Sequence, residues 1–162
     1  MDEKLISLAN ELGEILKEKS LTVTTAESCT SGWVGSALAA ASDSSRFYSS
    51  GFITYTNEAK QRVLGVSGDT LARFTAVSEA TVSEMACGAK KLSGDNIGLA
   101  TSGYAGPDGG EDGTPAGTVW FAWCLADESV HTSRQWFSGE SEEVVYKATL
   151  FSLSELKRLL TE

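Results

Sequence analysis

The sequence predicts an α/β fold in three layers, α/β/α, with a mixed sheet of about five strands and helices on both faces. Two observations predict it. Over the first hundred residues, segments with apolar residues at helical spacing alternate with short β-branched segments, which is typical of parallel strands covered by helices. Nearer the C-terminus, two strand-like segments are separated by a three-residue turn, which adds an antiparallel hairpin.

The length and composition indicate one folded unit. The chain has 162 residues, the size of an ordinary domain, and 41% of them are hydrophobic. Disordered chains lack such apolar content. We therefore expect a single domain over residues 1–162.

The first quarter of the chain begins with a helix over Glu3–Glu18, where apolar residues recur on one face. Residues 21–25 alternate and are rich in β-branched side chains, so they predict a strand. The polar and small residues 26–32 follow as a turn, and residues 33–41 form a helix of small residues.

The middle of the chain continues this alternation. We expect a strand over residues 51–55, a short helix over Asn57–Leu64 that Gly65 ends, and a helical turn near residues 69–73. Ser78 is a good N-cap for a helix that ends near residue 92.

The last third holds the hairpin and a long helix. Residues 96–101 predict a strand, and residues 102–117 form a glycine-rich loop that contains both prolines. Residues 118–126 and 130–137 predict the two strands of the hairpin. The final helix covers residues 140–160.

The charge of the chain excludes several partners. Thirteen Lys and Arg residues against 22 Asp and Glu residues give a net charge of −9, which repels nucleic acid and anionic membranes. The N-terminus is acidic where a signal peptide is basic, and no apolar segment is long enough to cross a membrane. We therefore expect a cytoplasmic protein with neither nucleic acid nor membrane as a partner.

Cysteine and histidine usage argues against a metal site. Cys29, Cys87 and Cys124 are odd in number and widely spaced, which favours reduced thiols. The single histidine, His131, has no nearby cysteine or histidine in the sequence. We expect no metal, and a Ser-His-Asp triad would depend on that one residue.

The first group of candidate residues lies between a predicted strand and a predicted helix. A sharp turn at Ser28 exposes its side chain and directs helix N–H groups toward the same place, where they can stabilise an oxyanion. The alternative is that Ser and Thr only cap the helix. Cys29 is a rival nucleophile, because a helix N-terminus lowers the pKa of a thiol.

The second group lies in residues 51–60. The predicted strand carries Tyr55, and the next helix places Lys60 one turn after its start. A lysine whose pKa is lowered by burial can act as a general base, and Ser-Lys pairs are an alternative to Ser-His pairs. The other interpretation is an ordinary solvated lysine.

The third group is the glycine-rich loop. Six glycines between Gly103 and Gly117 allow close approach of the backbone to a ligand, and loops of this length are usually functional. It lacks the Gly-Lys-Ser/Thr of a P-loop, so nucleoside triphosphate binding is not indicated. A plain surface loop is the alternative.

Together these segments resemble the CinA C-terminal domain family, in order and over nearly the whole chain. The segments that carry the resemblance are 25–30 (Thr-Ala-Glu-Ser-Cys-Thr), 51–60 (Gly-Phe-Ile-Thr-Tyr-Thr-Asn-Glu-Ala-Lys), 64–66 (Leu-Gly-Val), 76–79 (Ala-Val-Ser-Glu), 101–103 (Thr-Ser-Gly), 105–110 (Ala-Gly-Pro-Asp-Gly-Gly) and 117–119 (Gly-Thr-Val). Each segment alone is weakly specific, but the ordered set is highly specific.

The resemblance implies hydrolysis of nicotinamide mononucleotide to nicotinic acid mononucleotide and ammonia, with no metal or organic cofactor. It implies Ser28 as nucleophile, Lys60 as base and Tyr55 beside them. Relatives often form dimers, so it also implies a homodimer. The residues expected to bind the small nucleotide substrate are Glu27, Cys29, Thr30, Ser31, Gly32, Thr101, Ser102, Gly103 and Gly106.

Three departures from the family pattern leave an alternative open. Ser31 stands where relatives usually have glycine, and Tyr104 replaces a smaller aliphatic residue. Residues 139–145 lack arginines that many relatives carry there. The alternative is a weak or inactive paralogue of the same fold, which binds a nucleotide-like ligand or acts on another amide.

Overall fold

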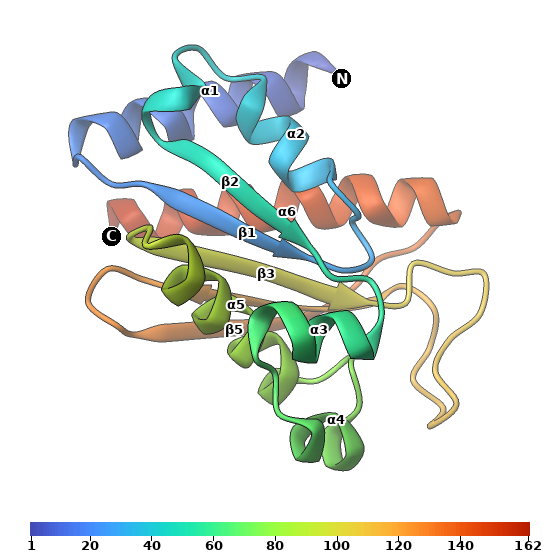
Figure 1. The fold of residues 1–162 in the computed structure, drawn as a ribbon. Helices are drawn as coiled ribbons and strands as arrows, with labels where there is room; N and C mark the ends of the chain where they lie inside the picture. The colour runs from blue at the N-terminus through green and yellow to red at the C-terminus, as the bar shows by residue number, and fades with distance from the viewer.

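A five-stranded mixed sheet forms the middle layer of the computed structural model, which describes residues 1–162 (Figure 1). The strands are β1 (Val23–Glu27), β2 (Tyr48–Ile53), β3 (Ile97–Gly103), β4 (Thr118–Cys124) and β5 (Val130–Trp136). Their order is β2-β1-β3-β4-β5; the first three are parallel, whereas β4 and β5 are antiparallel to their neighbours. The predicted α/β class and mixed sheet are confirmed.

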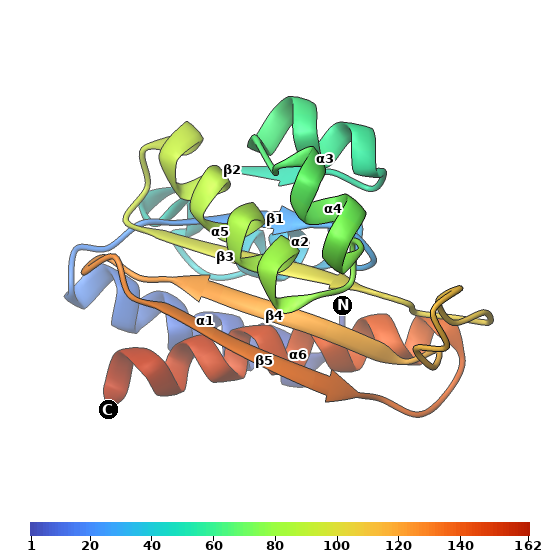
Figure 2. The ribbon, with the colours of Figure 1, turned by 90° about the horizontal axis from the view of Figure 1, so that it is seen from below.

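Helices cover both faces of this sheet (Figures 1 and 2). On one face lie α1 (Glu3–Glu18), α2 (Trp33–Ala39) and α6 (Ser141–Thr161), and on the other lie α3 (Asn57–Leu64), α4 (Gly68–Phe74) and α5 (Glu79–Ser93). A short 3₁₀ helix over Ser44–Arg46 precedes β2 and was not predicted. No helix is long and apolar enough to span a membrane.

The two faces of the sheet carry side chains of different size. Toward α1, α2 and α6, β4 contributes the large side chains of Phe121 and Trp123. Toward α5, β3 and β4 contribute Ala100 and Ala122. The small side chains let α5 pack closely: a Cβ added to Gly98 would lie 2.2 Å from the carbonyl oxygen of Ala86 in α5.

The strand boundaries differ from prediction around the site. The strand predicted over residues 21–25 runs over Val23–Glu27, so Glu27 belongs to the strand. The strand predicted over residues 51–55 ends at Ile53, and Tyr55 lies outside it. The physical reason is Thr56, whose hydroxyl accepts a hydrogen bond from Ala59 N (3.1 Å) and starts α3 at once.

The glycine-rich loop is a hairpin connection between β3 and β4. Tyr104 N donates to the carbonyl of Thr118 (2.9 Å), and Gly117 N donates back to the carbonyl of Tyr104 (2.6 Å). In Figure 1 the loop projects beyond the edge of the sheet where β1, β2 and β3 end. Parallel strands end at a common edge, so the turns after these strands can build one site.

Candidate active site

Ser28 and Lys60 meet at the carboxyl edge of the sheet. Lys60 Nζ lies 3.0 Å from Ser28 Oγ, although the residues are 32 positions apart in the chain. Ser28 is the first residue after β1, and Lys60 lies one turn into α3. The side chains are 7% and 1% exposed, so the contact is shielded from bulk water.

The surroundings of Lys60 Nζ determine what the amine can do. Nζ also donates to the carbonyl oxygens of Thr54 (2.9 Å) and Tyr55 (3.1 Å). Carbonyl oxygens only accept hydrogen bonds, whereas the Ser28 hydroxyl can also donate. In a neutral amine the two N–H bonds therefore satisfy the carbonyls and the lone pair faces Ser28 Oγ. This arrangement suits a lysine that accepts the proton of a serine.

Burial adjusts the basicity of Lys60. Removal from water disfavours the ammonium and lowers the pKa of Lys60 from 10.5 to about 8. Lys60 takes part in no ion pair, and its three partners are uncharged oxygens. A substantial fraction of Lys60 is thus neutral near physiological pH, as a general base requires.

The carboxylate of Glu27 occupies the N-terminus of α2. It accepts hydrogen bonds from the amides of Gly32 (3.2 Å), Val34 (2.9 Å) and Gly35 (3.0 Å), and Glu27 is 1% exposed. The sequence predicts that the backbone amides at the start of this helix point toward a substrate. At Gly32 this is wrong, because the amide donates its hydrogen bond to the Glu27 carboxylate. Glu27 instead holds the turn that carries Ser28.

Two threonines extend this network away from the cavity. Thr30 Oγ1 donates to Glu27 (2.6 Å), so the hydrogen of the contact between Thr30 and Thr101 (2.8 Å) comes from Thr101. Both threonines are fully buried. Their hydroxyls tie β3 to the turn after β1, and they do not line the cavity.

Glu27→Ala is expected to destabilise the fold by about 3 kcal/mol, because it leaves buried helix amides without an acceptor. Urea unfolding at pH 7 measures this loss. Glu27→Gln keeps one acceptor oxygen and the side-chain volume, so its loss should be smaller. Equal stability of Glu27→Ala and the unchanged chain would contradict the anchoring role.

Cys29 is poorly suited to act as the nucleophile. Desolvation raises the pKa of its thiol from 9.0 to about 12. The expectation that a helix N-terminus lowers this pKa is wrong, because Glu27 already neutralises that end of α2 and adds negative charge nearby. At neutral pH the thiol stays protonated.

Cys29→Ala should therefore keep the rate of amide hydrolysis within about threefold of the unchanged chain. The small change reflects lost packing, since the thiol lines the cavity. Steady-state rates of ammonia release measure it. A loss of a hundredfold or more would restore the thiol as a nucleophile.

The cavity beside Ser28 has a volume of about 270 Å³. It lies between the turn after β1, the start of α3, the segment before α5 and the glycine-rich loop. Among the residues expected to bind substrate, Cys29, Ser102, Gly103 and Gly106 line it, together with Tyr55. Ser31 does not.

The lining residues differ in what they offer. The hydroxyl of Ser102 is engaged, because it donates to the carbonyl of Ala76 (2.7 Å). Tyr55 is 68% exposed. Its backbone carbonyl accepts a hydrogen bond from Lys60 Nζ, so Tyr55 hydrogen-bonds to the Ser28-Lys60 pair through its backbone and not through its ring. The amides of Cys29 and Thr30 have no protein acceptor, which makes them the free donors next to Ser28.

Sequence reasoning did not assign five of the lining residues to the site: Ala76, Val77, Tyr104, Ala105 and Asp108. Tyr104 stood out only as a departure from the family pattern. Ala76 and Val77 come from the segment before α5 and Asp108 from the loop. Their only signal was membership of the motifs 76–79 and 105–110. No pattern within a motif indicates which members face a cavity.

Ser31 has a backbone φ of 38°, in the left-handed region that favours glycine. This agrees with the glycine that the family resemblance implies at this position. Its side chain is exposed.

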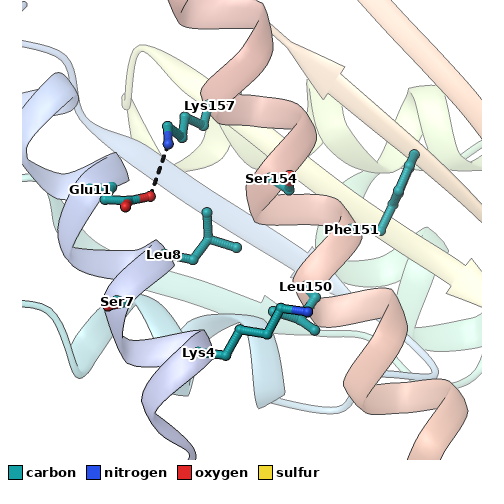
Figure 3. A pocket seen from close by; sticks show the side chains of 8 residues that line it. All are labelled: Lys4, Ser7, Leu8, Glu11, Leu150, Phe151, Ser154 and Lys157. Atoms are coloured by element: carbon teal, nitrogen blue, oxygen red, sulfur yellow. Dashed lines mark hydrogen bonds and ion pairs between the residues drawn. The ribbon is translucent and has the colours of Figure 1, made fainter.

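A larger hollow of about 530 Å³ lies between α1 and α6 (Figure 3). It contains Ser7, Ser154, Lys4 and Lys157, but Lys157 forms an ion pair with Glu11 (2.9 Å). No serine there hydrogen-bonds to a lysine, so the hollow lacks the arrangement found at Ser28. Nowhere in the structure do three or more His, Cys, Asp or Glu side chains gather in a way that could hold a metal ion.

Known proteins resemble the chain over almost its full length. Protein YdeJ from Escherichia coli K12 is 46% identical over 154 residues, which cover 95% of this chain and 89% of that protein. Nicotinamide-nucleotide amidohydrolase PncC from the same strain is 45% identical over 155 residues, covering 96% and 94%.

The solved structures agree. The crystal structure of competence damage-inducible protein A from Klebsiella pneumoniae superposes with a TM-score of 0.96 at 47% identity and covers 98% of each chain. A family model described as "CinA C-terminal domain" matches residues 5–160. The chain belongs to the CinA C-terminal domain family.

Proposed function

We propose that the chain hydrolyses the carboxamide of nicotinamide mononucleotide to nicotinic acid mononucleotide and ammonia, with Ser28 as nucleophile and Lys60 as base. The observation that carries the proposal is the 3.0 Å contact between Lys60 Nζ and Ser28 Oγ, in which the other two partners of Nζ are carbonyl oxygens. The name of the relative PncC supports the choice of substrate.

The reaction begins with proton transfer from the Ser28 hydroxyl to neutral Lys60. Ser28 Oγ then forms a bond to the carboxamide carbon, and the carboxamide oxygen becomes an oxyanion. Lys60 then gives the proton to the nitrogen, the C–N bond breaks and ammonia leaves. Water attacks the ester, loses a proton to Lys60 and releases the carboxylate, and Ser28 regains its proton.

The oxyanion needs hydrogen-bond donors close to Ser28. The free amides of Cys29 and Thr30 follow the nucleophile directly and are already fixed by the network around Glu27. Preorganised donors of this kind contribute most when they need no rearrangement. Gly103, Gly106, Ser102 and Tyr55 also line this cavity.

The rate should depend on pH through Lys60. Its pKa of about 8 in the folded chain means that the neutral base forms as the pH rises. We expect kcat/KM to increase about tenfold per pH unit below that value and to level off above it. Initial rates between about pH 6.5 and 9.5 measure the profile. A flat profile, or one that falls above pH 7, would contradict a lysine base.

Ammonia release from nicotinamide mononucleotide by purified protein tests the proposal directly. The second candidate is the weak or inactive paralogue. It is favoured by the start of α6, where Glu140 and Glu143 stand in a segment without arginine. Robust turnover excludes it. No turnover by the unchanged chain, with turnover by a Glu140→Asp, Ser141→Arg, Val145→Arg variant, supports it.

The cellular setting belongs to the same proposal. The net charge of −9 favours a partner that is a small molecule, not nucleic acid, and the proposed metabolic reaction belongs in the cytoplasm. The family resemblance favours a homodimer. Sedimentation equilibrium gives the mass in solution, and a mass of one chain would refute the dimer.

A further inference from the structure

The cavity beside Ser28 contains one charged side chain besides Lys60. This is Asp108, from the glycine-rich loop. Its carboxylate makes no hydrogen bond and no ion pair within the chain, and the residue is exposed. Lys60 is fully engaged by Ser28 and two carbonyl oxygens. Asp108 is therefore the one charged group of this cavity that no group of the chain engages.

Two aromatic side chains line the same cavity, Tyr55 and Tyr104. The ring of Tyr104 is packed against the loop backbone: a Cβ added to Gly110 would lie 2.8 Å from its Cε2. Gly110 therefore leaves room for this ring, and the loop holds it in place. Aromatic rings attract cations, and a nearby carboxylate adds to that attraction.

A smaller hollow of about 180 Å³ adjoins the cavity and shares Ala105 and Gly106 with it. No lysine or arginine lines this hollow, but Glu140 does. The N-terminus of α6 also faces it, and a capping box there pairs the Glu140 carboxylate with the amide of Glu143 and the Glu143 carboxylate with the amide of Glu140. A phosphate that extended into this hollow would find a carboxylate and no cation.

Both observations bear on how a substrate is selected. Nicotinamide that is substituted at its ring nitrogen carries a permanent positive charge on the ring, whereas free nicotinamide is neutral. A cavity of about 270 Å³ is smaller than the roughly 300–1,000 Å³ of sites that enclose drug-sized ligands, so it suits the ring and not a whole nucleotide.

We propose that this chain selects its substrate by the positive charge of the pyridinium ring, through Asp108 and Tyr104, and that the phosphate contributes little to binding. The substrate class is then any nicotinamide substituted at the ring nitrogen, including the nucleoside without phosphate. This inference rests on the proposed function, because it places the carboxamide at Ser28.

The test measures binding separately from catalysis. The Ser28→Ala chain is titrated at about pH 9, where Lys60 is largely neutral, with nicotinamide, 1-methylnicotinamide, nicotinamide riboside and nicotinamide mononucleotide, and binding is followed by ligand-observed NMR. We expect 1-methylnicotinamide to bind about tenfold more tightly than nicotinamide, because only the former is cationic. The riboside and the nucleotide should bind within about threefold of each other, because the phosphate meets no cation.

Asp108→Asn in the same background should remove most of the preference for 1-methylnicotinamide and leave the affinity for neutral nicotinamide unchanged. Tyr104→Leu should weaken binding of the cationic probe by about threefold. The matched control is Glu111→Gln, which removes the same charge from the same loop outside the cavity. It should keep the preference.

Equal binding of the first two probes, a nucleotide that binds tenfold or more tightly than the riboside, or no binding of any probe would each overturn the inference. So would equal effects of Asp108→Asn and Glu111→Gln. Turnover by the unchanged chain is measured separately. The absence of turnover would refute the proposed function. The binding preference would still show whether the cavity recognises the positive charge of the ring.

Discussion

Ser28→Ala is expected to lower kcat for ammonia release from nicotinamide mononucleotide by about a thousandfold or more, because Lys60 Nζ contacts the Ser28 hydroxyl and the neighbouring Cys29 thiol stays protonated. The methyl group occupies the space of CH₂OH without a reactive oxygen. Substrate binding should change little, since the ring and its substituent contact other lining residues. Single-turnover kinetics with the purified variant measure the loss.

The matched control for Ser28→Ala is Cys29→Ala, one residue further along the same turn. Both variants should unfold at nearly the same temperature, because neither side chain carries the Glu27 network. Retained ammonia release in Ser28→Ala, with loss in Cys29→Ala, would reverse the assignment of the nucleophile.

Lys60→Met is expected to reduce kcat/KM by about a thousandfold, because the Ser28 proton then has no acceptor. Lys60→Arg should be equally inactive, since a guanidinium stays protonated at every accessible pH. The lysine pKa of about 8 also makes the pH profile diagnostic: its rising limb should disappear in both variants.

A purely structural role for Lys60 would give a different result. A small primary amine such as ethylamine should partly restore Lys60→Gly if the missing function is proton transfer. The rescue should follow the concentration of unprotonated amine. Two results would contradict the role of Lys60 as a base. One is activity restored at low pH, where the amine is present as ethylammonium; the other is no restored activity at any pH in a correctly folded Lys60→Gly variant.

The order of helices and strands follows from local features of the sequence. The pattern of apolar residues predicted helix α1 over Glu3–Glu18. Gly65 predicted where helix α3, over Asn57–Leu64, ends. Caps, turns and periodicity act within a few residues, so they can be recognised along the chain. Of the boundaries that were wrong, the end of β1 depends on pairing with β2 and β3, whereas the end of β2 is set by the Thr56 cap that starts α3.

The sequence by itself determined the α/β class and, through the resemblance, directed attention to Ser28 and Lys60. Only the tertiary structure decided that Glu27 caps α2 and does not face the cavity, that Lys60 has no carboxylate partner, and that Asp108 is the free charge in the site. The reason is physical. Burial, hydrogen-bond partners and the resulting pKa depend on segments that are distant in the chain and meet only when the sheet and its loops are assembled.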